Sequence, residues 1–139
     1  MAIQQGLTTA FKVGMLNGVY DFTADTFKIA LYESTATLGP DTAAYTSAGE
    51  ISGAGYTAGG EALTVTQVPT SGSSTTAYIS FANASWSGAL TARGALIYQV
   101  GGGDPTVCVL DFGSDKTSNA TFTVQFPAST DTSAIIRIA

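Results

Sequence analysis

The sequence predicts an all-β fold: an antiparallel β-sandwich, jelly-roll-like, with a short N-terminal helix. Short segments that alternate apolar and polar residues recur along the chain, and clusters of Gly, Ser, Pro and Asp separate them. No helical pattern of 10–15 residues alternates with these segments, which argues against a parallel α/β sheet. The length of 139 residues and the absence of a linker tract predict one domain, residues 1–139, large enough to bury a core.

The one helix is predicted near the start of the chain, over residues 8–16. Phe11 and Met15 recur at helical spacing on one face, which Leu7 can extend. Thr8 or Thr9 supplies an N-cap, and Asn17-Gly18 ends the helix. Gly14 weakens the prediction, because glycine lowers helix propensity. A helix this short needs tertiary support.

The predicted strands follow from residue 27 onward. In residues 27–32, Phe27, Ile29 and Leu31 point one way, and the residues between them point the other. The strand at residues 106–112 is nearly all apolar, so we expect it to be central and covered on both faces. Five more strands are predicted at residues 62–68, 78–81, 92–98, 121–126 and 134–138.

Two loops stand out between the strands. Residues 34–48 form a long polar loop with Leu38 and Tyr45 as apolar anchors, and a loop of this length is usually functional or disordered. Residues 53–60 are rich in glycine but lack the Lys-Ser/Thr ending of a phosphate-binding loop. We interpret them as a tight bend in which glycine tolerates positive φ and Tyr56 packs the bend.

Charge and composition argue against nucleic acid and membranes as partners. Ten acidic and five basic residues give a net charge of −5, and the basic residues are scattered singly, whereas phosphate binding needs them clustered. No apolar run approaches the ~20 residues of a membrane span. We also see no basic stretch followed by an apolar core that would indicate a signal peptide.

The residue types that perform most enzymatic chemistry are scarce. The chain contains no histidine, the commonest general base and metal ligand. Asp21 with Asp25 is interpreted as turn capping, and the run 111–115 lacks the acidic spacing of a calcium loop. Cys108, the only cysteine, reads as a small buried hydrophobe. We therefore predict that the chain is not an enzyme and has no catalytic, cofactor-binding or metal-binding residues and no cofactor.

Several motifs, weak alone but specific in their order and spacing, cover nearly the whole chain. They lie at residues 11–32, 44–46, 49–51, 53–60, 63–64, 86, 92–98, 109–114, 122–127 and 135–139. In this order they resemble a family of small virion structural proteins of tailed bacteriophages. The resemblance implies a capsid decoration (cement) protein made in the host cytoplasm and located on the capsid surface of the virion. It implies the major capsid protein as partner and offers no catalytic residues; we expect a homotrimer.

A decoration protein needs a contact surface, and the N-terminal segment 1–16 is the candidate. It carries Ile3, Leu7, Phe11 and Met15, more apolar surface than a free terminus needs, so we predict contact with the capsid or a neighbouring subunit there. Deleting residues 1–16 should then abolish binding and leave the β structure intact. Loops or an exposed strand edge could also supply contacts.

Two other structural functions remain open. A glycan-binding head or tail fibre module would expose Trp86 and tyrosines for stacking on sugars, whereas a half-buried Trp86 would close one end of the sandwich. A tail-tube or tail-completion protein would form a ring, and sixfold symmetry would distinguish it from a trimer.

Overall fold

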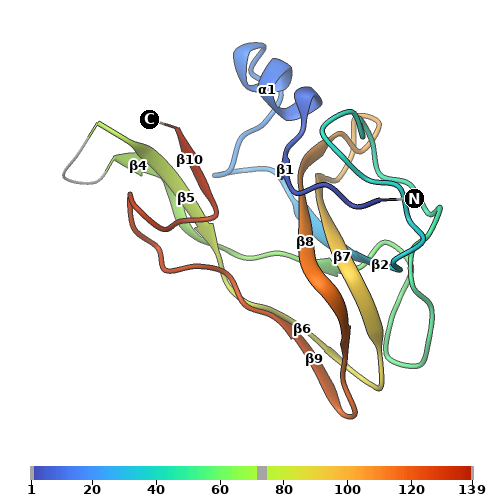
Figure 1. Cartoon of the computed structure of the whole chain (residues 1–139). Coiled ribbons are helices and arrows are strands. Elements are labelled where there is room, and N and C mark those ends of the chain that lie inside the picture. Colours follow the sequence, from blue (N-terminus) through green and yellow to red (C-terminus); the bar gives the residue numbers. More distant parts are fainter. Residues whose placement is uncertain (1, 72–74, 139) are drawn as a thin grey trace.

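The computed structural model describes residues 2–71 and 75–138, without the side chains of residues 68–70. Ten strands and one helix are formed by these residues (Figure 1). In chain order they are β1 (Gly6–Leu7), α1 (Thr9–Leu16), β2 (Phe27–Tyr32), β3 (Glu61–Ala62), β4 (Val65–Ser71), β5 (Ala77–Phe81), β6 (Ala84–Ser87), β7 (Thr91–Gln99), β8 (Thr106–Thr117), β9 (Thr121–Val124) and β10 (Ile136–Ile138).

The largest unit is a five-stranded sheet with the order β1-β8-β7-β2-β3. Its pairings are antiparallel, and β2 pairs with β7 from Phe27 opposite Gln99 to Tyr32 opposite Gly94. The sheet twists strongly, and its strands run from the end of the molecule that carries α1 toward the opposite end (Figure 1). Its three long strands form the interior of the protein.

Both faces of this sheet are buried, each in its own core. On β2, Ile29 and Leu31 face the larger core, and Ala30 and Tyr32 face the smaller one. The predicted alternation in residues 27–32 is therefore confirmed. The second face of the strand, which carries Ala30 and Tyr32, is buried too. Residues 106–109 of β8 are buried as well and residues 110–112 only partly, so the predicted cover on both faces is confirmed for the first part of this strand.

The remaining strands form a second layer. A three-stranded sheet, β10-β5-β4, and a two-stranded ribbon, β6-β9, pack against the larger core through Phe81, Trp86 and Phe122. The fold class is all-β with antiparallel sheets and a short helix, as the sequence predicts. The jelly-roll topology is not confirmed, because the strands divide into sheets of five, three and two rather than into two four-stranded sheets.

Helix α1 begins and ends where its capping residues predict. Thr8 is the N-cap, and its hydroxyl accepts a hydrogen bond from the Phe11 amide at 3.1 Å. Asn17 is the C-cap. Gly14 is explained by packing, because a Cβ atom there would lie 2.4 Å from the ring of Tyr20. The inner face of the helix buries Phe11 in the larger core, which supplies the tertiary support that so short a helix needs.

The long loop between β2 and β3 covers the smaller core. Leu38 is buried, and Tyr45 stacks on Tyr98 with ring centroids 4.8 Å apart, so both predicted anchors are confirmed. Gly60 has φ +82°, and a Cβ atom there would lie 1.9 Å from the Ile29 carbonyl oxygen. The glycines of residues 53–60 have positive φ, as predicted for a bend, and they also allow close backbone approach. Tyr56 anchors the bend by accepting a hydrogen bond from the Leu31 amide at 2.9 Å.

Three strand predictions need correction. The single strand predicted at residues 62–68 is two elements, β3 and β4, because the backbone turns away from β2 at residues 63–64 before pairing with β5. The strand predicted at 106–112 continues to Thr117 through a bulge. Strands β1 and β6 were not predicted, although the Ala84-Ser-Trp86-Ser alternation is the signal of β6.

Candidate functional site

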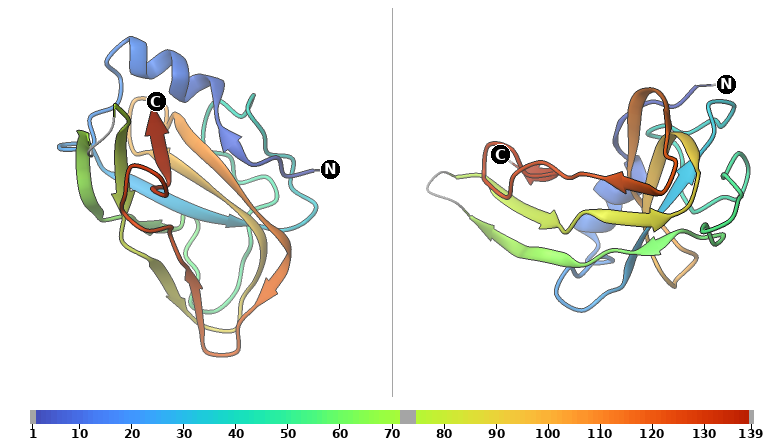
Figure 2. Two further views of the ribbon diagram at one scale, coloured as in Figure 1. Left: turned by 60° about the vertical axis from the view of Figure 1, so that its left-hand side comes forward. Right: turned by 90° about the horizontal axis from the view of Figure 1, so that it is seen from below.

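One end of the molecule gathers the large apolar side chains that the described residues leave in contact with water. We call this set the apolar end. Leu16 is 90% exposed and Val13 is 52% exposed, and helix α1 carries both on its outer face. The other members are Val19, Val100 and Ile138, which are 46%, 43% and 49% exposed. Helix α1, the β7–β8 turn and the C-terminal strand β10 all reach this end (Figures 1 and 2).

Backbone and side-chain hydrogen bonds position the members of the apolar end that lie outside the helix. The Gln99 side-chain amide donates to the Val19 carbonyl at 3.0 Å and also contacts the Asp25 carboxylate. The Val100 amide donates to the Thr26 carbonyl at 2.9 Å. These bonds tie the segment after α1 to the end of β7 and bring Val19 and Val100 to the same region.

A cavity of about 330 Å³ lies beside Phe11 and Met15 of α1. Its lining is almost entirely apolar and comes from α1, the segment after it, β5 and β10: Phe11, Met15, Tyr20, Phe22, Ala77, Tyr78, Ile79, Ile136 and Ile138. The exposed Val13 and Leu16 are not among its lining residues, and an apolar hollow of this kind can receive a side chain of a partner.

The charged residues on the elements of the apolar end are Lys12, Asp21, Asp25, Asp104 and Arg137. Lys12 is the only charged residue of α1. Asp21 lies in the turn after the helix, where hydrogen bonds from the hydroxyl and the amide of Thr23 lower the pKa of its carboxyl group. Asp25 accepts a hydrogen bond from the Asp21 amide at 2.8 Å. The prediction that Asp21 and Asp25 cap turns is therefore confirmed.

The four apolar residues predicted as contacts lie in two environments. Ile3 is buried in the smaller core and Phe11 in the larger core. Leu7 and Met15 are partly buried against the larger core. The side chains of Ile3 and Phe11 are thus occupied within their own chain, and the apolar surface that this segment offers comes from Val13 and Leu16 instead.

This placement also changes the best way to test the segment. Deleting residues 1–16 would remove Phe11 from the larger core and β1 from the edge of the five-stranded sheet. The expectation that such a deletion leaves the β structure intact does not fit this packing. Point substitutions on the outer face of α1 are the cleaner test.

A second concave surface lies at the opposite end of the molecule, beside the β8–β9 turn. We call this space of about 550 Å³ the β9 groove. Its lining combines two phenylalanines with hydroxyl, amide and ammonium groups: Phe112, Lys116, Thr117, Ser118, Thr121, Phe122, Thr123, Val124 and Gln125. Figure 1 shows β8 and β9 diverging from this turn, each with its own partner strand.

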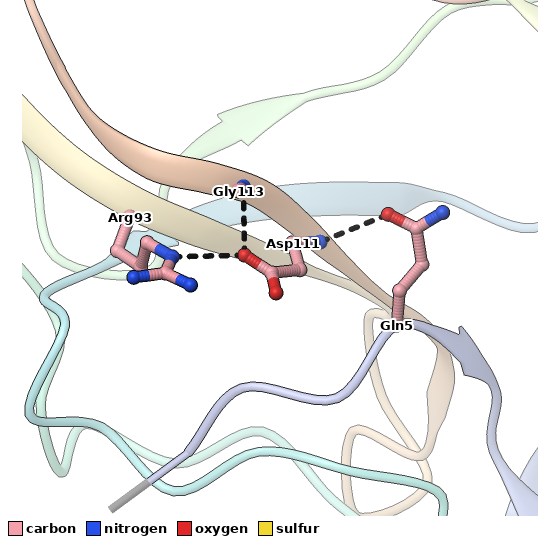
Figure 3. Close-up of polar contacts among 4 residues, drawn as sticks. All are labelled: Gln5, Arg93, Asp111 and Gly113. Carbon is pink, nitrogen blue, oxygen red and sulfur yellow. Dashed lines mark hydrogen bonds and ion pairs between the residues drawn. The ribbon is translucent and has the colours of Figure 1, made fainter.

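A bulge in β8 gives the groove its shape. Gly94 pairs with Asp111 and Ala92 pairs with Lys116, so residues 112–115 loop out of the ladder. The Asp111 carboxylate closes the bulge by accepting hydrogen bonds from Arg93 Nε at 2.9 Å and from the Gly113 amide at 2.8 Å (Figure 3). The Asp111 amide donates to the Gln5 side chain at 3.0 Å, which ties the N-terminal segment to β8.

Arg93 and Asp111 therefore act as a structural clamp. The guanidinium group, through its hydrogen bond, lowers the pKa of the Asp111 carboxyl, and Asp111 in turn raises the pKa of Arg93. The run 111–115, whose acidic residues we considered as a loose calcium loop, is this bulge. Within residues 2–71 and 75–138, no group of three or more His, Cys, Asp or Glu is arranged to hold a metal ion.

The other ionisable side chains considered, a carboxylate, its tyrosine partners and the thiol, are held in hydrogen bonds or buried. Glu50 accepts hydrogen bonds from the hydroxyls of Tyr45 and Tyr56, both at 2.6 Å, and from the Gly59 amide at 2.8 Å. Burial and this carboxylate raise the pKa of both tyrosines, so they stay protonated near neutral pH. Burial also raises the pKa of Cys108 to about 12, which keeps its thiol unreactive, as expected for a small buried hydrophobe.

Trp86 is more deeply buried than either sequence interpretation assumed. It is 2% exposed and lies between Tyr56 and Phe122, with ring centroids 6.2 Å from each. The prediction that Trp86 is exposed, on which the glycan-binding alternative depended, is therefore wrong. Tyr32 and Tyr98 are buried as well and offer no stacking surface.

No family model, no curated protein and no solved structure matches the chain. None of the helices in the described part of the chain is long and apolar enough to cross a membrane. The apolar end and the β9 groove are therefore interpreted from their own chemistry.

Proposed function

We propose that the chain is a decoration protein of a tailed-phage capsid, which binds the outer surface of the head and stabilises it as a closed oligomer, a homotrimer. The observation that carries this proposal is the apolar end. Exposed large apolar side chains are usually scattered singly over a monomer, whereas here they lie on elements that reach one end of the molecule. We propose that this end is buried between copies of the chain.

The energetics of the apolar end favour assembly. Removing apolar surface from water contributes about 25 cal/mol per Å², and Leu16, which is 90% exposed, has almost all of its area available for burial. The outer face of α1 carries Val13 and Leu16 beside Thr9 and Lys12, whereas a solvated surface helix is normally polar on that face.

The remaining chemistry supports a role in shape and contact. The chain lacks histidine, its thiol is buried, and the carboxylates of Asp21, Asp111 and Glu50 hold turns, a bulge and a loop. The order of motifs along the sequence resembles small virion proteins and points the same way. A decoration protein needs no reacting groups, because it acts by presenting a surface that is complementary to the capsid.

Binding to heads tests the function directly. Heads of the phage that encodes the chain, prepared without this protein, should bind the purified chain at a fixed number of copies per lattice unit. The decorated heads should resist heat or low ionic strength better than bare heads. Co-sedimentation measures the binding, and cryo-electron microscopy counts the copies. Mature particles that are complete without the chain would overturn the proposal.

The subunit contact has its own test. Leu16→Asn should shift the sedimentation coefficient from that of a trimer toward that of a monomer without unfolding the chain, because Leu16 is 90% exposed. Ala120→Asn is the matched control, an exposed residue in the β8–β9 turn at the opposite end. A Leu16→Asn variant that remains trimeric would remove the apolar end as the subunit contact. Rings with sixfold symmetry would favour a tail-tube or tail-completion protein instead.

A further inference from the structure

Strand β9 has one edge that carries no partner strand among the described residues. β9 pairs with β6 alone, with Phe122 opposite Trp86 and Val124 opposite Ala84. The Gly88 amide donates to the Ala120 carbonyl at 2.7 Å, which fixes the alternation of the ladder. Because bonded pairs recur at every second residue, Phe122 and Val124 bond to β6, and the backbone groups of Thr121 and Thr123 point to the other side.

The outward backbone groups of Thr121 and Thr123 face the β9 groove. Residues 121 to 125 all line the groove, although successive side chains of a strand point to opposite faces. A hollow lined by both faces of a strand must run along its edge. No hydrogen bond joins the backbone N–H or C=O of Thr121 or Thr123 on this edge to another of the described residues. The groove thus presents free strand-pairing groups next to the phenyl ring of Phe112.

The charges around the groove select the occupant. Lys116 lines it, and no carboxylate does. The neighbouring Asp115 lines a different hollow, with Arg93 and Glu33. Lys116 forms no ion pair with another of the described residues. In a chain of net charge −5, a groove whose only charge is positive is complementary to an acidic segment.

We propose that the β9 groove binds an extended, carboxylate-bearing segment of the capsid subunit, which adds to β9 as a further strand. This inference rests on the proposed function, of which it names the contact. The segment pairs through its backbone with Thr121 and Thr123, places a carboxylate at Lys116 and packs an apolar side chain on Phe112. The groove lies at the end of the molecule opposite the apolar end, so both contacts can form at once (Figure 1).

A proline on the free edge tests the strand pairing. Thr123→Pro removes an N–H that points away from β6, so the β6-β9 ladder keeps its hydrogen bonds. Thr123→Ala is the matched control, because both variants lose the hydroxyl contact with Ser85 and only the proline variant loses the N–H. We expect Thr123→Pro to weaken binding to bare heads at least about tenfold and Thr123→Ala to change it less than about threefold.

A charge reversal tests the acidic segment. Lys116→Glu should weaken binding to bare heads about tenfold and reduce its dependence on salt, and Lys116→Gln should weaken it less. Trp86, the only tryptophan, lies in β6 opposite Phe122, so its fluorescence reports whether the β6-β9 ribbon of each variant is folded. Thr121→Pro with its control Thr121→Ala supplies a second edge pair if Thr123→Pro loses this signal.

The outcomes separate this inference from the proposed function. If the wild-type chain binds heads and folded Thr123→Pro and Lys116→Glu bind equally well, the groove is not the contact and the function stands. If folded Thr123→Pro loses its oligomeric state in sedimentation and keeps its affinity for heads, a second copy occupies the groove and the inference is wrong. If the wild-type chain binds no heads, both proposals fail.

Discussion

The centre of the five-stranded sheet and the apolar end use the same residue types for opposite purposes. In β7, every residue from Gly94 to Gln99 is buried, with Ile97 facing the larger core and Leu96 the smaller one. At the apolar end, Leu16 and Val13 stand in water. Hydrophobicity alone therefore does not tell whether an apolar residue belongs to a core or to a contact surface. The burial of its side chain in the folded chain does.

The difference predicts which substitutions affect the fold and which affect assembly. In the sheet centre, a lost side chain leaves a cavity that its neighbours cannot fill, because the strand is packed on both faces. At the apolar end, a lost side chain leaves no cavity in the single chain. The predictions below test this contrast, beginning with the largest effect.

The largest expected effect is that of Ile97→Ala. Ile97 is fully buried in the larger core, so we expect the free energy of unfolding to fall by about 3–4 kcal/mol. Leu16→Ala should change it by less than about 0.5 kcal/mol at concentrations that keep the chain monomeric. Urea unfolding followed by Trp86 fluorescence measures both. Similar losses from the two variants would refute the division into core and contact surface.

The next effect concerns the polar network under the long loop. Glu50→Ala leaves the hydroxyls of Tyr45 and Tyr56 and the Gly59 amide without their acceptor, so we expect a loss of about 2–3 kcal/mol. The control is Glu61→Ala, because Glu61 is exposed in β3 and should tolerate the change. Thermal unfolding of the two variants measures the difference. An equal loss would show that the network does not hold the loop.

Alkaline pH should loosen the same region. Burial raises the pKa of Tyr98 to about 12, and burial also raises the pKa of Tyr32, Tyr45 and Tyr56 above the usual value of 10.0. The unfolded chain therefore loses these protons first, so the contribution of these tyrosines to stability is constant below pH 10 and falls as pH rises from 10 toward 12. Tm measured from pH 8 to 12 should show this decline. Tyr98→Phe, which removes one titrating group, should give a shallower slope.

The smallest effect belongs to the clamp on the β8 bulge. Arg93 and Asp111 are partly exposed, so water screens their attraction, and Arg93→Ala should cost less than Glu50→Ala. Arg93 lowers the pKa of Asp111, so its contribution is present above the usual carboxyl pKa and disappears as pH falls through the lowered value. The difference in Tm between wild type and Arg93→Ala should therefore shrink on acidification. A constant difference from pH 7 to 2 would assign the effect to lost packing.

Much of the fold could be predicted from local pattern. The alternation in residues 27–32 and 92–98 predicts β2 and β7, because a strand with a period of two must place successive side chains on opposite faces. Thr8 and Asn17 predict the limits of α1, because capping depends on the residues next to the helix. The glycines of residues 53–60 predict a bend with positive φ, although not the backbone segments that approach them there.

The candidate contacts were only partly predictable. Apolar residues in segment 1–16 indicate that it packs against something, but the pattern is the same for a core and for an interface. Phe11 and Ile3 pack in the chain's own cores, and Leu16 does not. The sequence did contain a signal for an exposed apolar surface. Val13 and Leu16 do not lie on the helix face that carries Phe11, and Lys12 is the only charged residue of α1. The β9 groove had no local signal, since a free strand edge depends on which strands pair.

The sequence by itself determined the β class, the helix, most strand positions and the absence of histidine, because each depends on residue type and on neighbours a few positions away. Only the tertiary structure decided that Trp86 is buried, that Gly88 and Ala120 set the free edge of β9, and that Val100 and Ile138 join Leu16 at one end. These features bring together residues far apart in the chain. The pairing of strands and the packing of the cores decide which distant residues come into contact, and no local sequence pattern contains that information.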